Sequence, residues 1–237
     1  IIEKPMCMNE SQLLKIFNLL KRKKKLKITS NLVLRVNSLF NKFKKKIDIN
    51  KLYYIEADYL WGRKSKLFGW RSNIKDYSVI YGAAIHMIDL VIWLTGLKPI
   101  NVYTYGSDKV TKKSKFKKKS FTICLFEFPK NILVKITANT SAVYEHIHEL
   151  KIFSKEHTLV HNKSGSHIYS NGKFKNIRSN YPDKKNRKKL IQNFIDYLLK
   201  KNDKPLISHR ELFDLMSVCF AAEKSMHLKK KVKINYL

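Results

Sequence analysis

The sequence predicts an α+β fold in which an open, largely antiparallel sheet packs on helices by one face. Most strand-like patterns lie between residues 101 and 170, where branched and aromatic residues alternate with polar ones. Helical patterns precede and follow this block. Strands in succession, with helices before and after them, are typical of an antiparallel sheet whose helices are segregated to one side.

The first sixty residues predict two helices and two strands. Asn9 can cap a helix that runs to about Arg22. Residues 27–30 then predict a short strand, and residues 33–47 predict a second helix with an apolar side. Residues 53–61 alternate as a strand, and one face of it would carry Tyr53, Ile55, Ala57 and Tyr59.

The stretch 82–96 predicts a helix that carries two ionisable groups on an apolar body. His86 and Asp89 are three residues apart and share a face, which Trp93 extends; Gly96 ends the helix. An imidazole and a carboxylate presented together from a largely buried helix can handle protons near neutral pH. The alternative is a core histidine satisfied by the neighbouring acid.

The later part of the chain predicts the strands of the sheet and its closing helices. Strand patterns occupy residues 101–106, 121–128, 133–140, 150–153, 158–161 and 166–170. Residues 129–131 are a hairpin turn between two of them. The lysine-rich stretch 109–119 is expected to be a mobile loop, because no core could absorb it. Helices over residues 184–200 and 209–227 and a strand at 232–234 complete the fold.

Composition and charge limit the function classes. The 237 residues carry a formal net charge of +31, and almost all of the excess is lysine. Lysine, isoleucine and asparagine are abundant together, as an A/T-rich coding sequence would produce without any functional demand. Specific nucleic-acid binding usually relies on arginine, which is scarce here, so we expect only weak, salt-sensitive binding to polyanions.

Two further absences are informative. No uncharged apolar run is long enough for a membrane span. The three cysteines, Cys7, Cys124 and Cys219, are far apart and odd in number, which indicates buried thiols in a reducing compartment and neither a disulfide frame nor a zinc site. A cytoplasmic location is therefore expected.

A series of short motifs extends along the whole chain. It opens Ile1-Ile2-Glu3-Lys4-Pro5, which predicts the end of a buried strand that runs into a turn. The later motifs are Gly62-Arg63, Gly69-Trp70-Arg71, Gly-x-x-x-His-x-x-Asp-x-x-x-Trp-Leu-x-Gly at 82–96, and the runs at 193–196, 204–208 and 221–225. In this order and spacing they resemble the glucose–fructose oxidoreductase and inositol dehydrogenase family, Gfo/Idh/MocA.

The resemblance implies a nicotinamide-dependent oxidoreductase of which this chain is a fragment. Such enzymes begin with a Rossmann domain whose Gly-x-Gly-x-x-Gly loop holds the pyrophosphate of NAD or NADP, and the seven glycines here nowhere approach that pattern. Residues 1–31 would be the last strand–helix–strand of this truncated domain. Residues 32–237 would be a C-terminal domain for substrate binding and oligomerisation, and the fragment itself would be inactive. The alternative is a small complete domain that never bound a nucleotide.

The resemblance also implies roles for individual residues. Glu3, Lys4 and Pro5 would lie at the cofactor, with Lys4 beside the nicotinamide and in contact with the reacting carbinol. The family's helix motif is Asp-x-x-x-His. His86 matches the catalytic histidine, but Gly82 stands at the aspartate position. Either Lys4 and His86 suffice, or the substrate supplies the missing group, or this branch works differently.

Four other residues are candidates for substrate binding. Asp89 could orient His86 or hydrogen-bond a sugar hydroxyl, and it could also merely pair with a neighbour. Arg63 and Arg71 can form forked hydrogen bonds with a carboxylate or phosphate, and Trp70 offers a flat face to a sugar ring or base. Alternatively, Trp70 anchors this loop to the core and Arg71 pairs with a local acid.

Tyr144, His146 and His148 alternate on one predicted strand face after residues 133–140. In the family this face of the sheet helps to line the substrate cleft or forms the oligomer contact, and His146 is the fifth substrate-binding candidate. A His-x-His metal pair is the competing interpretation. It lacks a clear third ligand, so we expect no metal.

The sequence therefore predicts the C-terminal part of an NAD(P)-dependent oxidoreductase that acts on a secondary carbinol of a sugar, sugar acid or nucleotide sugar. An open sheet covered on one side leaves an apolar face, so a homo-oligomer through that face is expected. One alternative is a non-catalytic sugar-binding or oligomerisation module of the same fold. A polyanion-binding basic protein is the other.

Overall fold

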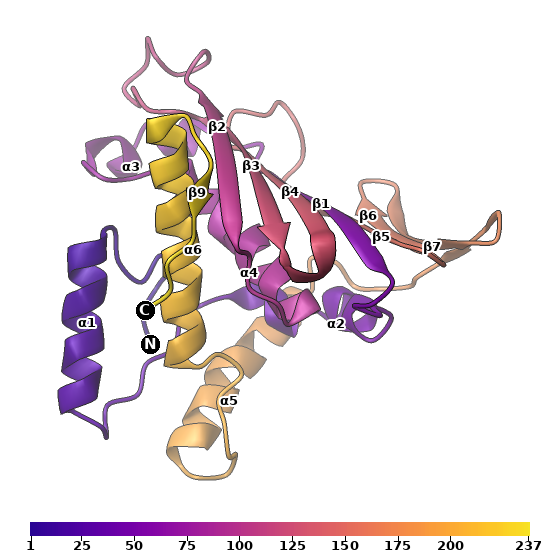
Figure 1. Ribbon diagram of the computed structural model, residues 1–237, viewed down its shortest axis with the longest axis horizontal. Coiled ribbons are helices and arrows are strands. Elements are labelled where there is room, and N and C mark those ends of the chain that lie inside the picture. Colours follow the sequence, from indigo (N-terminus) through magenta and orange to yellow (C-terminus); the bar gives the residue numbers. More distant parts are fainter.

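One nine-stranded sheet organises the molecule. A computed structural model describes all residues from 1 to 237 (Figure 1). In sheet order the strands are β8 (Lys173–Asn176), β7 (Gly165–Ser170), β6 (Thr158–Asn162), β5 (Ile147–Ser154), β1 (Leu52–Leu60), β4 (Ile132–Asn139), β3 (Phe121–Phe128), β2 (Asn101–Ser107) and β9 (Val232–Lys233). Only β1 and β4 pair in parallel. The predicted α+β class with an open, largely antiparallel sheet is confirmed.

The chain also forms six α-helices, and two of them pack directly on one face of the sheet. The six helices are α1 (Glu10–Arg22), α2 (Ser38–Lys44), α3 (Trp70–Asn73), α4 (Ile85–Thr95), α5 (Lys188–Leu198) and α6 (His209–Leu228). The long helix α6 packs on β2, and α4 lies beside α6 and packs on β1. Helix α1 lies beyond α6 (Figure 1). The opposite face of the sheet exposes side chains such as Tyr105, Leu125 and Leu133 to solvent.

Local capping explains where three of the helices begin or end. The Asn9 side chain accepts a hydrogen bond from the Gln12 backbone N–H at 3.0 Å, as predicted. Ser208 and Glu211 form a reciprocal capping box at the start of α6. Gly96 ends α4 in a left-handed conformation, with φ of 68°, that glycine adopts without strain.

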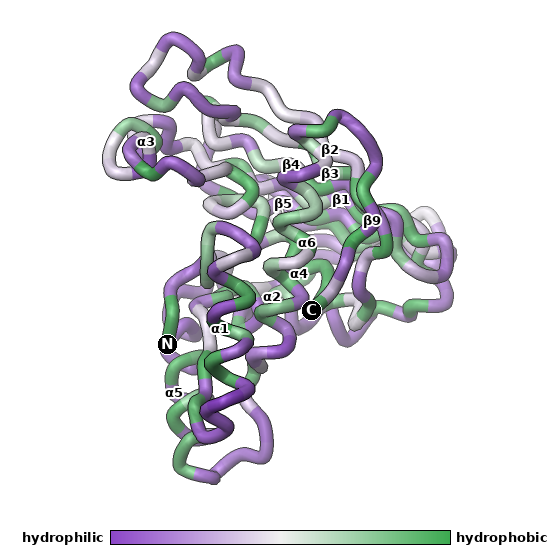
Figure 2. Tube along the Cα trace, turned by 60° about the vertical axis from the view of Figure 1, so that its left-hand side comes forward, coloured by the Kyte–Doolittle hydropathy of each residue, from purple (hydrophilic) through white to green (hydrophobic).

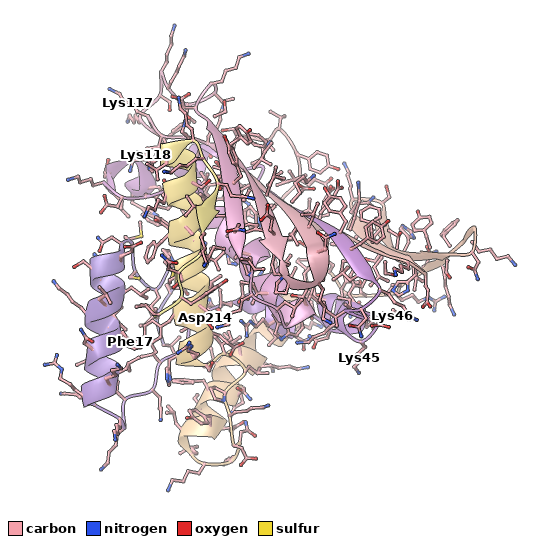
Figure 3. The ribbon with its side chains drawn as sticks, in the orientation of Figure 1. Phe17, Lys45, Lys46, Lys117, Lys118 and Asp214 are labelled. Carbon is pink, nitrogen blue, oxygen red and sulfur yellow. The ribbon has the colours of Figure 1, made fainter.

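The core lies between the sheet and the helices. Side chains of the central strands alternate, so that residues such as Ile55 and Val134 are buried while their neighbours in sequence are not. In Figure 2, α1 and α5 alternate between apolar and polar residues, which is typical of helices that bury one face. Phe17 of α1 points toward α6 (Figure 3) and meets Phe213 edge-on, with ring centroids 5.4 Å apart.

Two predicted elements before β1 differ from the structure. The predicted helix 33–47 is divided, because the Asn37 side chain accepts a hydrogen bond from the Leu39 N–H and so caps a new helix, α2. Residues 33–36 form a separate 3₁₀ turn. The predicted strand 27–30 is reduced to a single parallel bridge between Ile2 and Ser30, since no longer pairing is made there.

Three further expectations needed correction. Tyr53 does not share the buried face of β1, because an irregularity in the register between Leu52 and Tyr54 leaves its side chain 52% exposed. The stretch 109–119 is not a loose loop. Phe116 is fully buried against Tyr77, with ring centroids 5.9 Å apart. Strand β8 at the far edge of the sheet was not predicted, because its side chains are all exposed and follow no period-two pattern of burial.

The same lysine-rich segment is held at its other end as well. Lys118 donates hydrogen bonds to the carbonyl oxygens of Ile74 and Lys75. Lys118 and its neighbour Lys117 lie beside the C-terminal end of α6 (Figure 3). The three cysteines are buried and unpaired. None of the helices combines the length and apolar character needed to cross a membrane.

Candidate active site

A cavity of about 1030 Å³ lies between the N-terminal turn, helix α4 and the outer strands of the sheet. Its lining comes from residues far apart in the chain: the turn at residues 3–4, the segment 31–37, the end of β1, His86 of α4, strands β5 to β7, and the segment 176–187. The two predicted catalytic residues, Lys4 and His86, both line it. The structure thus brings together groups that are 82 residues apart.

Lys4 lies on the turn between Glu3 and Pro5 and lines this cavity. Its Nζ donates a hydrogen bond to the Gly82 carbonyl oxygen at 2.5 Å, which fixes the amine beside the start of α4. Burial, and then the positive charge of Arg71, lower the pKa of Lys4 to about 8. Glu3 accepts a hydrogen bond from the Asn31 side chain at 3.0 Å, so the turn is attached to the segment beside it.

His86 projects from the first turn of α4 and stacks on the phenol ring of Tyr59 in β1. The ring centroids are 5.7 Å apart and the planes differ by 8°. Burial, followed by the charge of Lys4, holds the pKa of His86 well below its ordinary value. The imidazole is therefore neutral near pH 7 and can accept or donate a hydrogen bond without carrying charge.

Three more histidines extend from His86 toward β6. His146 meets the Tyr59 hydroxyl at 3.1 Å through Nε2. His148 meets the Tyr181 hydroxyl at 2.7 Å through Nδ1. Burial lowers the pKa of His146 to about 4, with smaller contributions from the charges of Arg63 and Arg187. The sequence signal for these partners is the alternation of His146 and His148, but nothing in it points to the tyrosines. The predicted strand face is wrong in part, because β5 begins at Ile147 and only His148 lies in the strand.

The third of these histidines, His161, lies on β6. Its Nδ1 lies 2.9 Å from the Ser166 hydroxyl, whereas its buried Nε2 has no hydrogen-bond partner. Burial lowers its pKa to about 4. No group of three or more histidine, cysteine or acidic residues in the chain has the geometry of a metal site. The cavity combines these imidazoles and phenols with several cationic side chains, of which Lys4 is the one beside α4.

Asp89 was a substrate-binding candidate, but the structure directs it away from the cavity. Its carboxylate is buried in an ion pair with Arg35, with Arg35 Nη2 2.6 Å from Asp89 Oδ1. The same guanidinium contacts Glu211 at the start of α6. Of the three interpretations open for Asp89, pairing with a neighbour is the one that the contacts match. His86 and Asp89 share a helix but not an environment.

Two candidates from the loop after β1 also lie outside the cavity lining. The Arg71 guanidinium lies over the Trp70 ring, 4.1 Å from its centroid, and over the Trp61 ring at 5.1 Å. The Trp70 side chain itself is 59% exposed. Arg71 therefore packs within its own loop and acts on the site through its charge near Lys4. Arg63 and His146 do line the cavity.

Tyr77 fills the space that the absent side chain of Gly82 leaves. A Cβ built on Gly82 would lie 1.9 Å from the Tyr77 hydroxyl oxygen and 2.6 Å from its ring. The Tyr77 side chain is buried, and its ring meets Trp70 edge-on at 6.1 Å. The phenol thus occupies the place where the related motif carries an aspartate. Sequence reasoning missed this partner because Tyr77 lies in a turn with no periodic pattern.

The family described as the GFO/IDH/MocA C-terminal domain matches residues 42–160, half of the chain. The matched segment includes β1, α4, β2 to β5 and the cavity residues Tyr59, Arg63, His86, His146 and His148. The chain belongs to the Gfo/Idh/MocA family. No curated protein sequence matches it.

Solved structures of this family superpose on almost the whole chain. An oxidoreductase structure from Thermotoga maritima matches with a TM-score of 0.81 at 16% identity, over 98% of this chain and 71% of that one. A UDP-N-acetylglucosamine 3-dehydrogenase from Acidithiobacillus ferrooxidans gives 0.76 at 18%, over 96% and 70%. Scyllo-inositol dehydrogenase from Lactobacillus casei, solved with NAD(H) and scyllo-inositol, gives 0.79 at 14%, over 98% and 72%. At these identities the likeness establishes the fold of this Gfo/Idh/MocA chain.

Proposed function

We propose that this chain is the C-terminal, substrate-binding part of an NAD(P)-dependent oxidoreductase that acts on a secondary carbinol of a sugar, sugar acid or nucleotide sugar. The observation that carries the proposal is that Lys4 and His86 line the same polar cavity, close enough for the charge of Lys4 to lower the pKa of His86. Membership in the family and the named sugar, inositol and nucleotide-sugar dehydrogenases of the same fold support it.

The pKa values of the two residues suit proton transfer near neutral pH. With a pKa of about 8, the Lys4 amine is present in both its protonated and its neutral form near neutral pH. Its Nζ can take the hydroxyl proton of the carbinol as that carbon is oxidised, and can return it in the reverse direction. His86 can accept a hydrogen bond from the same hydroxyl through a neutral ring nitrogen, and its stacking on Tyr59 holds the ring in place. A bound nicotinamide supplies the hydride acceptor or donor.

The residues present fit the reacting end of such a cofactor. The turn formed by Glu3, Lys4 and Pro5 places a desolvated amine at the cavity, where it can act on a carbinol held beside a nicotinamide ring. The chain has no Gly-x-Gly-x-x-Gly loop that could hold the pyrophosphate. Turnover is therefore to be measured in a protein in which a dinucleotide-binding domain precedes residue 1.

In that protein, Lys4→Ala and His86→Ala should each lower turnover by about two to four orders of magnitude, as expected for the loss of a proton-transfer group. The measurement is the steady-state rate of nicotinamide reduction with a panel of sugars, sugar acids and nucleotide sugars. Lys25→Ala and His209→Ala, which remove exposed side chains of the same types, serve as matched controls. Near-normal turnover of Lys4→Ala would reject the proposed role of the lysine.

The contact between Tyr77 and Gly82 favours one alternative function, a sugar-binding module without redox chemistry. Tyr77 occupies the position of the family's usual aspartate, so no carboxylate is available there to polarise the reacting centre. The same panel separates the two functions. A protein that binds one of these sugars and NAD(P) but transfers no hydride to or from either would be a binding module of this fold.

We propose in addition that the uncovered sheet face joins two copies of the chain. Tyr105, Leu125 and Leu133 on that face are 58%, 46% and 52% exposed, and they line a shallow apolar groove of about 460 Å³. Sedimentation at micromolar protein should show a dimer or larger oligomer, and Leu125→Lys with Leu133→Lys should dissociate it. Leu198→Lys, at an equally exposed leucine of α5, should leave the oligomer intact. A wild-type monomer would contradict this assignment.

A further inference from the structure

Arginines are concentrated at the cavity, although most of the basic residues of the chain are lysines. Seven of the 49 basic Lys and Arg residues are arginines, and three of these, Arg63, Arg178 and Arg187, line the cavity. They come from three separate places: the loop after β1, the segment after β8 and the turn before α5. The lysine bias of the chain as a whole does not account for arginines at this one site.

Most of the remaining arginines have partners within the protein. Arg35 is buried in its ion pair with Asp89, Arg71 lies over two tryptophan rings, and Arg210 pairs with Asp214. Arg22 lies in the last turn of α1 and is not part of the cavity lining. In contrast, none of the three cavity arginines forms an ion pair. Their guanidinium groups remain available to a ligand.

No acid in the cavity neutralises these arginines. The only two acidic residues that line it are already engaged: Glu145 pairs with Lys163 at 3.0 Å, and Glu3 accepts the hydrogen bond from Asn31. Arg63 and Arg187 act on the same group, since the charges of both lower the pKa of His146. An anion bound beside His146 would therefore be attracted by both guanidinium groups, and the two acids of the lining are already engaged.

The space beside these arginines exceeds what a single sugar ring needs. Ligand cavities of about 300–1,000 Å³ already hold drug-sized molecules, and this one measures about 1030 Å³. The lining also includes short polar side chains from β6, β7 and their connecting turn: Asn162, Ser164 and Ser166. The cavity therefore has room for a sugar ring together with an attached anionic group.

We propose that Arg63, Arg178 and Arg187 bind a phosphate or diphosphate group of the substrate, while the attached sugar lies at Lys4 and His86. This assignment rests on the proposed function for which end of the ligand reacts. Three forked cations suit the several oxygens and double charge of a phosphate ester better than the single charge of a sugar acid, which one guanidinium can satisfy. The phosphate could belong to a nucleoside diphosphate sugar or to a sugar phosphate.

Calorimetry on the 237-residue chain at about 150 mM salt tests this without turnover or cofactor. The probes are UDP, galactose 1-phosphate, free galactose and glucuronate. We expect the phosphate-bearing probes to bind more tightly than the other two. Arg63→Gln and Arg187→Gln should each weaken that binding about tenfold. The matched control Arg22→Gln removes the same charge away from the cavity and should change it less than twofold.

The outcomes separate the possible sources of binding. Tighter binding of UDP than of galactose 1-phosphate would identify a nucleoside diphosphate sugar, and the reverse order a sugar phosphate. An equal loss in Arg22→Gln would show that the net charge of the chain causes the binding, and would overturn the proposal. Arginine-dependent binding of glucuronate alone, or no binding of either phosphate, would overturn it too. Absence of turnover with a tightly bound phosphate ligand would contradict the proposed oxidoreductase function only.

Discussion

Helix α4 presents two ionisable side chains to two contrasting surroundings. His86 faces the cavity, where burial keeps it neutral and an aromatic ring stacks on it. Asp89, three residues later, is sealed against Arg35 with both side chains 2% exposed. Their spacing places the two residues on one helix face. In the structure His86 lines a cavity that is open to ligands, whereas Asp89 lies in the protein interior.

The difference lies in what packs against each residue. Opposite His86 is Tyr59 of β1, whose hydroxyl continues to His146. Opposite Asp89 is a guanidinium that also reaches Glu211 of α6 and the Leu206 carbonyl. The buried ion cluster therefore ties α4 to α6, and it holds in place the helix that presents His86. Spacing along a helix predicts which residues are neighbours, and the facing element decides their role.

Replacing Asp89 by alanine should have the largest effect on this arrangement. The change leaves the Arg35 guanidinium buried beside Glu211 alone, and breaking a buried pair in this way typically costs about 3–5 kcal/mol of unfolding free energy. Urea unfolding followed by circular dichroism measures the loss. His86→Ala, on the same helix, should cost only about 1 kcal/mol.

A double variant decides whether the loss comes from the unpaired charge. Asp89→Leu combined with Arg35→Met removes both charges and should recover much of the stability lost in Asp89→Ala. Equal losses for Asp89→Ala and His86→Ala would mean that the two sides of α4 do not differ as their contacts indicate.

The strands could be predicted from sequence because one face of the sheet is buried. Where burial alternates strictly, as in β3, the predicted residues 121–128 match the strand at both ends. The ends of α1 and α6 were predictable from Asn9 and from the apolar pattern after Ser208. Local chemistry is sufficient for elements of this kind, since the information lies within a few residues of each boundary.

The parts that could not be predicted depend on contacts between distant residues. In the sequence, Phe116 is surrounded by lysines and predicts no packed segment. The segment packs because Phe116 contacts Tyr77, which lies 39 residues earlier. The role of Asp89 could not be predicted, because its partner Arg35 lies 54 residues away in the sequence. At the site, Lys4 and His86 could be predicted because each belongs to a recognisable motif. Arg178 and Arg187 stand in lysine-rich stretches with no pattern that distinguishes them.

A methyl group at Gly82 should cost less than the change at Asp89 and should act on the cavity side of α4. The Cβ of Gly82→Ala would lie 1.9 Å from the Tyr77 hydroxyl, so the phenol must move, and overpacking of this kind costs about 1–3 kcal/mol. Thermal unfolding measures it. Gly69→Ala is the matched control, because its Cβ would meet no atom within 4 Å.

The pairing of Gly82 with Tyr77 can be tested directly. Tyr77→Leu removes the ring, so Tyr77→Leu with Gly82→Ala should be less destabilised than the sum of the two single changes. Additive losses would show that the phenol does not occupy the space at Gly82, and they would leave the missing aspartate of the motif without a replacement.

The smallest expected effect is a pH dependence that belongs to the cavity side alone. The pKa values of His146 and His161 are lowered to about 4 in the folded protein, mainly by burial, against an ordinary value of 6.5. The unfolded chain therefore binds more protons than the folded one as the pH falls below about 6.5, and stability should decrease from pH 7 to pH 5. Each such histidine adds at most about 1.4 kcal/mol per pH unit to that slope.

His161→Phe should make this slope shallower, because it removes one imidazole that folding keeps neutral while retaining an aromatic ring beside Phe40 and Tyr181. Urea unfolding at pH 7, 6 and 5 measures the slope. Exposed His209, changed to glutamine, controls for the loss of a histidine as such. A slope that stays the same in His161→Phe would mean that the buried imidazole takes up its proton without unfolding. The cavity would then tolerate charge as readily as the Asp89 side of the helix does.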